Sequence, residues 1–181
     1  MQSEYNQMNI LNVELKARCH DPERVLTLLK EREAEFRGID HQVDTYFTVP
    51  NGRLKLREGD IENSLIFYHR DNEPGAKSSH IELLPLDETG DLKSLLTAAL
   101  GIWVVVDKKR EIYFIDNVKF HIDLVDNLGH FIEVEAIDKN GNFGEPTLRQ
   151  QCRFYRDLFD IGEKDLVAES YSDLLHKDTQ T

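Results

Sequence analysis

Asn12-Val-Glu-Leu-Lys-Ala-Arg18 alternates polar and apolar residues, and Arg53-Leu-Lys-Leu-Arg57 repeats the pattern after an Asn51-Gly52 pair. Successive side chains of a β-strand point to opposite faces, so residues i and i+2 share a face about 6.5 Å apart. Each stretch therefore predicts a strand with one apolar face and one charged face. The Asn-Gly pair is typical of the tight turn that joins two antiparallel strands.

The same period of two continues through most of the chain. Further strands are predicted at 42–48, 65–70, 79–84, 102–115, 118–125 and 130–136. Three helices are expected between them: one from Pro22 to shortly before Gly38, with Asp21 as its N-cap, and two at about 88–100 and 146–160. Eight antiparallel strands with inserted helices indicate an α+β fold, with a closed or nearly closed β-barrel and the helices packed outside.

Length and composition set the class of protein. The chain has 181 residues, of which 40% are hydrophobic and 31% charged, as expected for one ordinary globular domain over residues 1–181 with a core at about 9–175. No apolar run approaches the roughly 20 residues of a membrane-spanning helix. The N-terminus lacks the pattern of a secretory signal, and Cys19 and Cys152 cannot form a disulfide framework or a thiolate zinc site. We therefore expect a cytoplasmic protein.

Charge is unevenly placed in this sequence. The formal net charge of −12 argues against general attraction to nucleic acid or to an anionic membrane. Basic residues nevertheless share strand faces, as in 53–57, whereas Glu133 and Glu135 share another face. One interpretation is an open sheet whose charged face is solvated. The other is a closed sheet whose charged faces line a lumen that holds a polyanion, with Mg²⁺ bridging carboxylates and phosphates.

The same residues resemble those of the CYTH superfamily, the triphosphate tunnel metalloenzymes. The first-strand signature of that group, Glu-x-Glu-x-Lys, corresponds here to Asn12-Val-Glu14-Leu-Lys16. The class IV adenylyl cyclase-like branch is resembled most, over nearly the whole chain. The remaining motifs that carry the resemblance are 44–58, Lys108-Lys-Arg110, His121-Ile-Asp123 and 128–135.

The resemblance implies a tunnel that holds a triphosphate between basic residues, with one or two Mg²⁺ or Mn²⁺ ions on the acidic side. By motif, the implied metal ligands are Glu14, Asp123, Glu133 and Glu135. The implied phosphate-binding residues are Lys16, Lys55, Arg57, Arg70, Lys108 and Arg110. Of these sets, Asp123, Lys16 and Arg110 are the implied catalytic residues. Asn12 departs from the signature, and its neutral amide lowers the expected metal affinity.

Three functions stay open at this point. Attack of the ribose 3′-hydroxyl of ATP on the α-phosphorus gives cyclic AMP and pyrophosphate, the reaction of an adenylyl cyclase. Attack of water on the terminal phosphorus gives an inorganic or thiamine triphosphatase. The third function is non-catalytic binding of triphosphate or polyphosphate. In each case the expected partner is a triphosphate-bearing small molecule such as ATP, neither nucleic acid nor a membrane is expected, and the protein is expected to be a monomer or homodimer.

Overall fold

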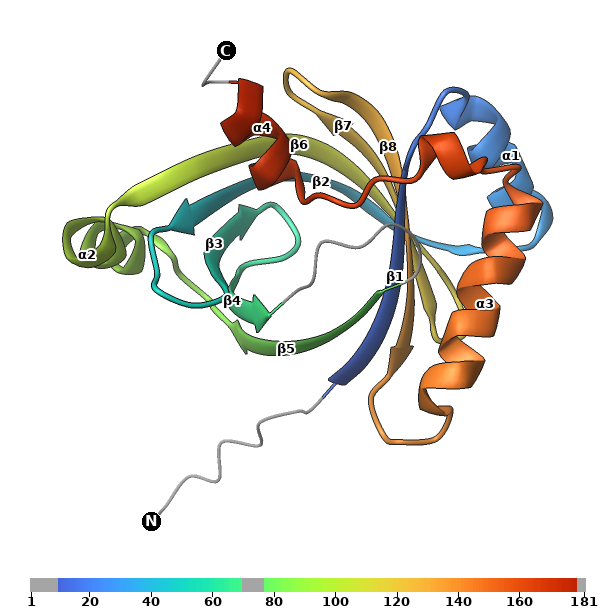
Figure 1. Ribbon diagram of the computed structural model, residues 1–181, viewed down its shortest axis with the longest axis horizontal. Coiled ribbons are helices and arrows are strands. Elements are labelled where there is room, and N and C mark those ends of the chain that lie inside the picture. Colours follow the sequence, from blue (N-terminus) through green and yellow to red (C-terminus); the bar gives the residue numbers. More distant parts are fainter. Residues whose placement is uncertain (1–9, 70–76, 179–181) are drawn as a thin grey trace.

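The computed structural model describes residues 10–69 and 77–178 (Figure 1). This region contains eight strands, and the predicted antiparallel strands are confirmed. Their bounds are β1 Ile10–Arg18, β2 Glu35–Phe47, β3 Arg53–Gly59, β4 Ser64–His69, β5 Lys77–Pro85, β6 Ile102–Ile115, β7 Val118–Val125 and β8 Gly129–Asp138. The helices are α1 Pro22–Glu31, α2 Gly90–Leu100, α3 Gly144–Leu158 and α4 Tyr171–Asp178, with a 3₁₀ turn at Glu163–Asp165.

The strands form one antiparallel sheet that curls strongly (Figure 1). Their order is β1-β5-β4-β3-β2-β6-β7-β8, and β8 also pairs with β1. The register of that pairing places Glu14 opposite Glu135 and Lys16 opposite Glu133. The charged residues of β1 and β8 are therefore neighbours on the concave face.

The aliphatic core lies on the convex side of β1, β7 and β8. Val13, Leu15 and Ala17 of β1 are at most 2% exposed and pack with residues of α1 and α3. Leu29 of α1 and Cys152 of α3 are fully buried in the same cluster. Because these helices cover the apolar faces, the alternate residues of the same strands are directed to the concave side. Helices α1 and α3 therefore pack outside the sheet, as predicted.

Helix α1 is shorter than the sequence predicts. It begins with Asp21 as N-cap, as expected, but ends at Glu31. Glu33 has a φ of 56°, a left-handed conformation that ends the helix, and the chain continues at Glu35 into β2. Phe36, which falls within the predicted helix, lies in β2 and is 51% exposed. The prediction that this helix continues to shortly before Gly38 is therefore wrong.

The C-terminal segment contains a helix that the sequence analysis did not predict. Residue Tyr171 of α4 is 5% exposed and packs on Phe131 of β8 with ring centroids 4.9 Å apart. Arg53 of β3 donates to Asp173 at 2.9 Å, so an ion pair also connects α4 to the sheet. The segment therefore packs against the sheet near one opening of its concave side.

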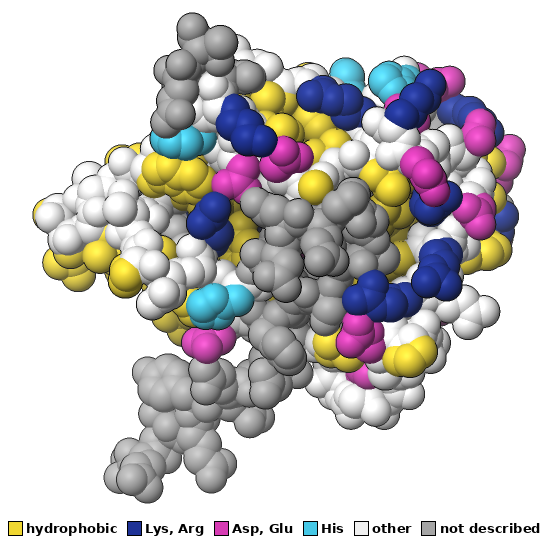
Figure 2. Space-filling view, in the orientation of Figure 1, with side chains coloured by type: hydrophobic (Ala, Val, Ile, Leu, Met, Phe, Trp, Pro, Cys, Tyr) yellow, Lys and Arg dark blue, Asp and Glu magenta, His cyan; other side chains and the backbone are white. Residues whose placement is uncertain are grey.

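The outer surface differs from this interior. Figure 2 shows Lys, Arg, Asp and Glu side chains intermingled over the side of the molecule where α1 lies, and hydrophobic side chains at the end where α2 lies. Leu95 of α2 is 65% exposed, and no residue of that helix is buried. No helix in the described part of the chain is long and apolar enough to cross a membrane.

Candidate active site

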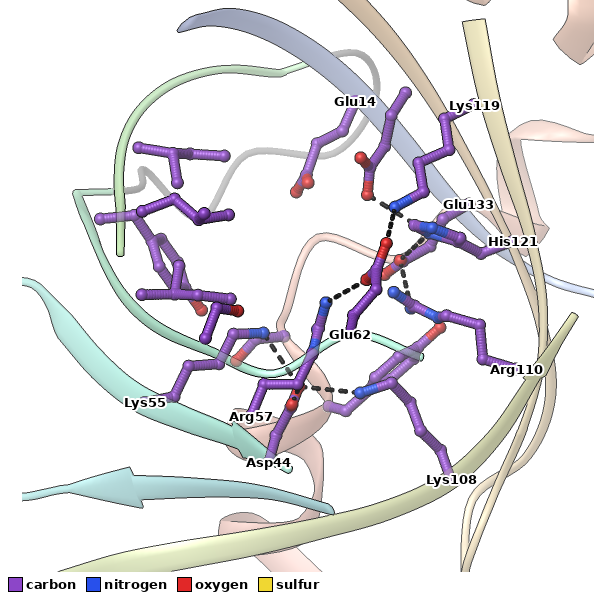
Figure 3. Close-up of a pocket in the computed structure, with 18 of the residues that line it drawn as sticks. Glu14, Asp44, Lys55, Arg57, Glu62, Lys108, Arg110, Lys119, His121 and Glu133 are labelled. Atoms are coloured by element: carbon purple, nitrogen blue, oxygen red, sulfur yellow. Dashed lines mark hydrogen bonds and ion pairs between the residues drawn. The ribbon is translucent and has the colours of Figure 1, made fainter. Parts of the chain in front are cut away.

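A cavity of about 500 Å³ lies on the concave side of the sheet. Its described walls carry six basic and five acidic side chains from seven different parts of the fold (Figure 3). The basic side chains are Lys16, Lys55, Arg57, Lys108, Arg110 and Lys119, and the acidic ones are Glu14, Asp44, Glu62, Glu133 and Glu135. The sequence-predicted residues Glu14, Lys16, Lys55, Arg57, Lys108, Arg110, Glu133 and Glu135 are thus brought together. Arg70 lies outside the described residues.

Asp44 of β2 gathers three of the cations. Its carboxylate accepts from Lys55 at 2.9 Å and from Lys108 at 2.8 Å. Arg57 donates to the same carboxylate through Nε at 2.8 Å and Nη2 at 3.0 Å. Burial raises the pKa of Asp44, but the charges of Arg57, Lys108 and Lys55 outweigh it and hold the pKa well below its ordinary value. Asp44 is therefore an anion that keeps these cations on one side of the cavity.

Lys108 is the most deeply buried of these cations, at 1% exposure. Burial lowers its pKa from 10.5 to about 7, because the ammonium loses its hydration and faces other cations, with Asp44 acting in the opposite direction. Lys108 is therefore a cavity cation whose charge changes near neutral pH.

A second ionic group is centred on Arg110 of β6. Its Nε and Nη2 donate to Asp123 at 2.7 and 2.6 Å, and Nη2 also donates to Glu133 at 2.6 Å. Lys16 contacts the other oxygen of Glu133 at 3.0 Å. Burial raises the pKa of Glu133, but Lys16 and Arg110 hold it well below its ordinary value. Glu133 is thus an ionised ligand shared by two cations.

Asp123 lies behind Arg110 and does not line the cavity. It is completely buried, and its carboxylate accepts from Arg110 and, at 2.8 Å, from the hydroxyl of Tyr171. A carboxylate with these partners holds a guanidinium in place. The environment therefore favours a positioning role for Asp123 over the metal-ligand role expected from the sequence.

The acidic side of the cavity has donor atoms suited to a divalent cation. One ligand atom each from His121, Glu133 and Glu135 lie within 4.8 Å of one another. Glu14 is the register partner of Glu135, so its carboxylate comes from the adjacent strand. The side-chain oxygen of Asn12 is buried and has no hydrogen-bond partner in the described part of the chain. Carboxylate and amide oxygens are the ligands that Mg²⁺ prefers, so this donor set fits a hard cation.

Three residues of the site were missed by sequence reasoning. Lys119 shares a strand face with His121 and Asp123, and strand alternation alone could have found it. Asp44 falls within the motif at 44–58 but had no assigned role. Glu62 lies between β3 and β4, where no periodic pattern points to the cavity.

One wall of the cavity is apolar. It is formed mainly by β4, β5 and the segments that follow β3 and β5, opposite the acidic cluster. Its described residues are Ile61, Ile66, Tyr68, Ile81, Leu83, Pro85 and Leu86. The cavity therefore offers both an ionic surface and an apolar one.

Comparison with known proteins identifies the family. The CYTH domain model matches residues 11–171. A Methanocaldococcus jannaschii protein named "Putative adenylate cyclase" is 24% identical over 174 residues, covering 91% of this chain and 98% of its own length.

Solved structures share the fold. One from Pyrococcus horikoshii has a TM-score of 0.78 at 21% identity and covers 90% of this chain and 98% of its own. A Hippeastrum protein, described as a "putative adenylyl cyclase" with a dominant triphosphatase activity, has a TM-score of 0.55 at 14% identity, covering 93% and 96%. The family model, which matches most of the sequence, shows that the chain belongs to the CYTH domain family.

Proposed function

We propose that this protein is a divalent-metal-dependent enzyme that acts on the triphosphate of a nucleotide. The observation that carries the proposal is the gathering of six Lys and Arg side chains and a carboxylate cluster in one internal cavity of a CYTH domain. We propose further that the ring of strand pairings encloses a tunnel, a view supported by the pairing of β8 with β1. Cytoplasmic location, a single domain over 1–181 and a monomeric or homodimeric state stay predictions from the sequence.

Charge balance supports the metal requirement. The described cavity walls carry nearly as many carboxylates as cations, so the protein alone provides little net charge to offset a triphosphate. In the proposal, Glu14, Glu133 and Glu135 hold one or two Mg²⁺ or Mn²⁺ ions, with the unpartnered oxygen of Asn12 as an additional ligand. A bound metal would neutralise charge on the phosphate oxygens and make the phosphorus more electrophilic. The neutral Asn12 weakens this site relative to a carboxylate.

In the proposal, two groups of cations bind the phosphates from opposite walls of the cavity. Lys16 and Arg110 lie beside the proposed metal ligand Glu133 and are the residues placed closest to the reacting phosphate. Lys55, Arg57 and Lys108 form the opposite wall around Asp44. Lys119 joins the set because it lines the same cavity, and Arg70 stays a prediction from its motif. Asp123 acts through Arg110 by fixing its guanidinium.

The apolar wall favours an organic triphosphate over an inorganic one. A pocket that combines apolar walls with a few placed polar groups suits a ligand with a polar and an apolar part. We place the nucleoside against β4 and β5 and the phosphates against β1, β6 and β8. The ribose 3′-hydroxyl then attacks the α-phosphorus and releases its proton to solvent. The bond from the α-phosphorus to the α,β-bridging oxygen breaks, and pyrophosphate leaves as cyclic AMP forms.

Hydrolysis is the second candidate, because the same phosphate clamp serves attack by water on the terminal phosphorus. The Hippeastrum protein, whose fold is similar, is described as having a dominant triphosphatase activity. Non-catalytic binding of triphosphate or polyphosphate is the third candidate, and the neutral Asn12 is the feature that favours it.

Product analysis tests these candidates. The protein is incubated with Mg²⁺ or Mn²⁺ and, in turn, with ATP, tripolyphosphate and thiamine triphosphate. Cyclic AMP with equimolar pyrophosphate supports the cyclase, and orthophosphate supports the triphosphatase. Tight binding without turnover supports the binding module. Absence of both binding and turnover for all of these ligands contradicts the proposed function.

A further inference from the structure

Glu62 reaches into the cavity from the short segment between β3 and β4. Figure 3 shows its side chain in the middle of the ionic cluster, between Arg57 on one wall and Lys119 on another. One carboxylate oxygen lies 2.6 Å from Lys119 Nζ. The other lies 3.2 Å from Arg57 Nη1 and 3.3 Å from the side-chain amide of Gln42. Glu62 thus makes the kind of contacts that a phosphate oxygen would make.

These contacts use the donors that an incoming anion needs. The Nε and Nη2 groups of Arg57 donate to Asp44, and Nη1 donates to Glu62. All three nitrogens of this guanidinium therefore already have a carboxylate partner. The Glu62 carboxylate occupies the position between Arg57 and Lys119, so a phosphate group that bridges these two cations there has to displace it.

The backbone around Glu62 is held in place by a network of its own. The fully buried Asp40 accepts from the backbone amides of Ile61 at 2.9 Å and Glu62 at 3.1 Å. A Cβ at Gly59 would lie 2.7 Å from the Asp40 carboxylate and 2.7 Å from the Glu62 carbonyl, so the close approach requires glycine. The segment is built to present Glu62 to the cavity.

The Glu62 carboxyl is ionised at neutral pH. Burial raises the pKa of its carboxyl, but the charges of Lys119 and Arg57 outweigh it and hold the pKa well below its ordinary value. A tethered anion competes with a free one at a high effective concentration. Its presence beside two cations therefore lowers the affinity of the cavity for other anions.

We propose that Glu62 is a specificity-determining residue that occupies the place of one phosphate group and must be displaced from Arg57 and Lys119 by the ligand. This inference rests on the proposed triphosphate site. Displacement favours ligands with several phosphate groups, because their other contacts, to Lys108, Arg110 and Lys16, compensate for the lost Glu62 pairs. Singly charged anions and small carboxylates lack those further contacts and are excluded.

Metal-free binding of tripolyphosphate tests the proposal. Isothermal titration calorimetry in EDTA compares the wild type with Glu62→Gln, which is isosteric and neutral. Asp60→Asn is the matched control, because Asp60 lies in the same segment, is exposed, and does not line the cavity. We expect Glu62→Gln to bind tripolyphosphate about tenfold more tightly than the wild type, the equivalent of one charged hydrogen bond. Asp60→Asn is expected to match the wild type.

A second variant guards against a folding defect. Glu62→Asp shortens the side chain and is expected to tighten binding less than Glu62→Gln. Binding no tighter than wild type in both variants overturns the proposal, as does equal tightening by Asp60→Asn. Failure of the wild type to bind tripolyphosphate or ATP, with or without Mg²⁺, refutes the triphosphate site as well. Wild-type binding with unchanged variants refutes only the role of Glu62.

Discussion

At the scale of single residues, the charges of the cavity already have partners of opposite sign. Asp44 forms ion pairs with Lys55, Arg57 and Lys108, and Glu133 forms ion pairs with Lys16 and Arg110. Separating any one of these charges from its partner leaves an uncompensated ion in a buried place, which is costly. A ligand therefore has to replace the partner it displaces, and a metal–phosphate complex carries both signs of charge.

Glu135 provides the test of the metal site. Glu135→Gln removes a negative charge from the acidic cluster and is expected to lower Mn²⁺-dependent turnover about 100-fold or more, with Mn²⁺ affinity falling in parallel. Titration of Mn²⁺ by calorimetry and product release measure both effects. Glu82→Gln is the control, since Glu82 lies on β5 with its side chain exposed. Unchanged Mn²⁺ affinity in Glu135→Gln would remove this residue from the metal site.

Lys108 provides a test based on pH. Its pKa of about 7 means that the ligand-free protein loses this positive charge as the pH rises above 7. An anion binds the protonated form better, so binding takes up a proton and the contribution of Lys108 to affinity falls with rising pH. Relative to Lys108→Arg, which stays charged, wild-type affinity for tripolyphosphate is expected to fall by up to about tenfold per pH unit above 7.

Calorimetry from pH 6 to 9 measures this difference, and the comparison between variants removes the ionisation of the ligand itself. Lys93→Arg, which changes a lysine of α2 paired with Glu58, is expected to follow the wild type. Parallel pH profiles for wild type and Lys108→Arg would contradict the prediction that Lys108 loses its charge near pH 7.

Alternation explains why some of these residues could be predicted from sequence and others could not. Lys16, Arg110 and Glu133 lie in regular strands, where the apolar residues between them fix which side chains point inward. Glu62 lies in a non-repetitive segment, and its direction depends on hydrogen bonds to Asp40, which is remote in sequence. The orientation of the Glu62 side chain therefore depends on tertiary contacts and cannot be predicted from the local sequence pattern.

At the scale of elements, α4 extends the site although it lies outside the sheet. The hydroxyl of Tyr171 donates to Asp123, and Lys16 Nζ lies 4.1 Å from the centroid of the Tyr171 ring. The helix has only eight residues, and its sequence predicts little by itself. Its docking depends on Asp123 and Phe131, which only the folded sheet places side by side.

Tyr171→Phe tests this connection. The variant loses the hydrogen bond to Asp123 and is expected to lower the free energy of unfolding by about 1 kcal/mol, because Arg110 still satisfies the carboxylate. It is also expected to weaken tripolyphosphate binding, because Arg110 is held less firmly. Tyr113→Phe loses a comparable hydrogen bond to Glu111 outside the cavity. Chemical denaturation and calorimetry on both variants measure the effects, and equal loss of binding in the two would argue against a role for α4.

The early end of α1 shows a limit of helical patterns. Phe36 continues the apolar spacing of the helix. The strand β2 nevertheless begins at Glu35, and Phe36 pairs with Tyr113 of β6. The end of α1 is therefore set by long-range pairing between strands, which the local sequence pattern does not predict.

At the scale of the whole molecule, the curled sheet separates two environments. Its convex side carries the aliphatic core under α1 and α3, and its concave side carries the charged cavity. The sequence predicts this division because nearly every strand alternates, and the structure places both faces accordingly. A solvated charged face does not fit, because Lys16 and Arg110 are at most 5% exposed.

A crystal structure with a non-hydrolysable ATP analogue and Mn²⁺ tests the central claim most directly. The account predicts anomalous Mn²⁺ density beside Glu14, Glu133 and Glu135, with the phosphates between that density and Lys16, Arg110 and Lys108. Phosphates bound on the convex surface, or Mn²⁺ held away from these three carboxylates, would contradict it.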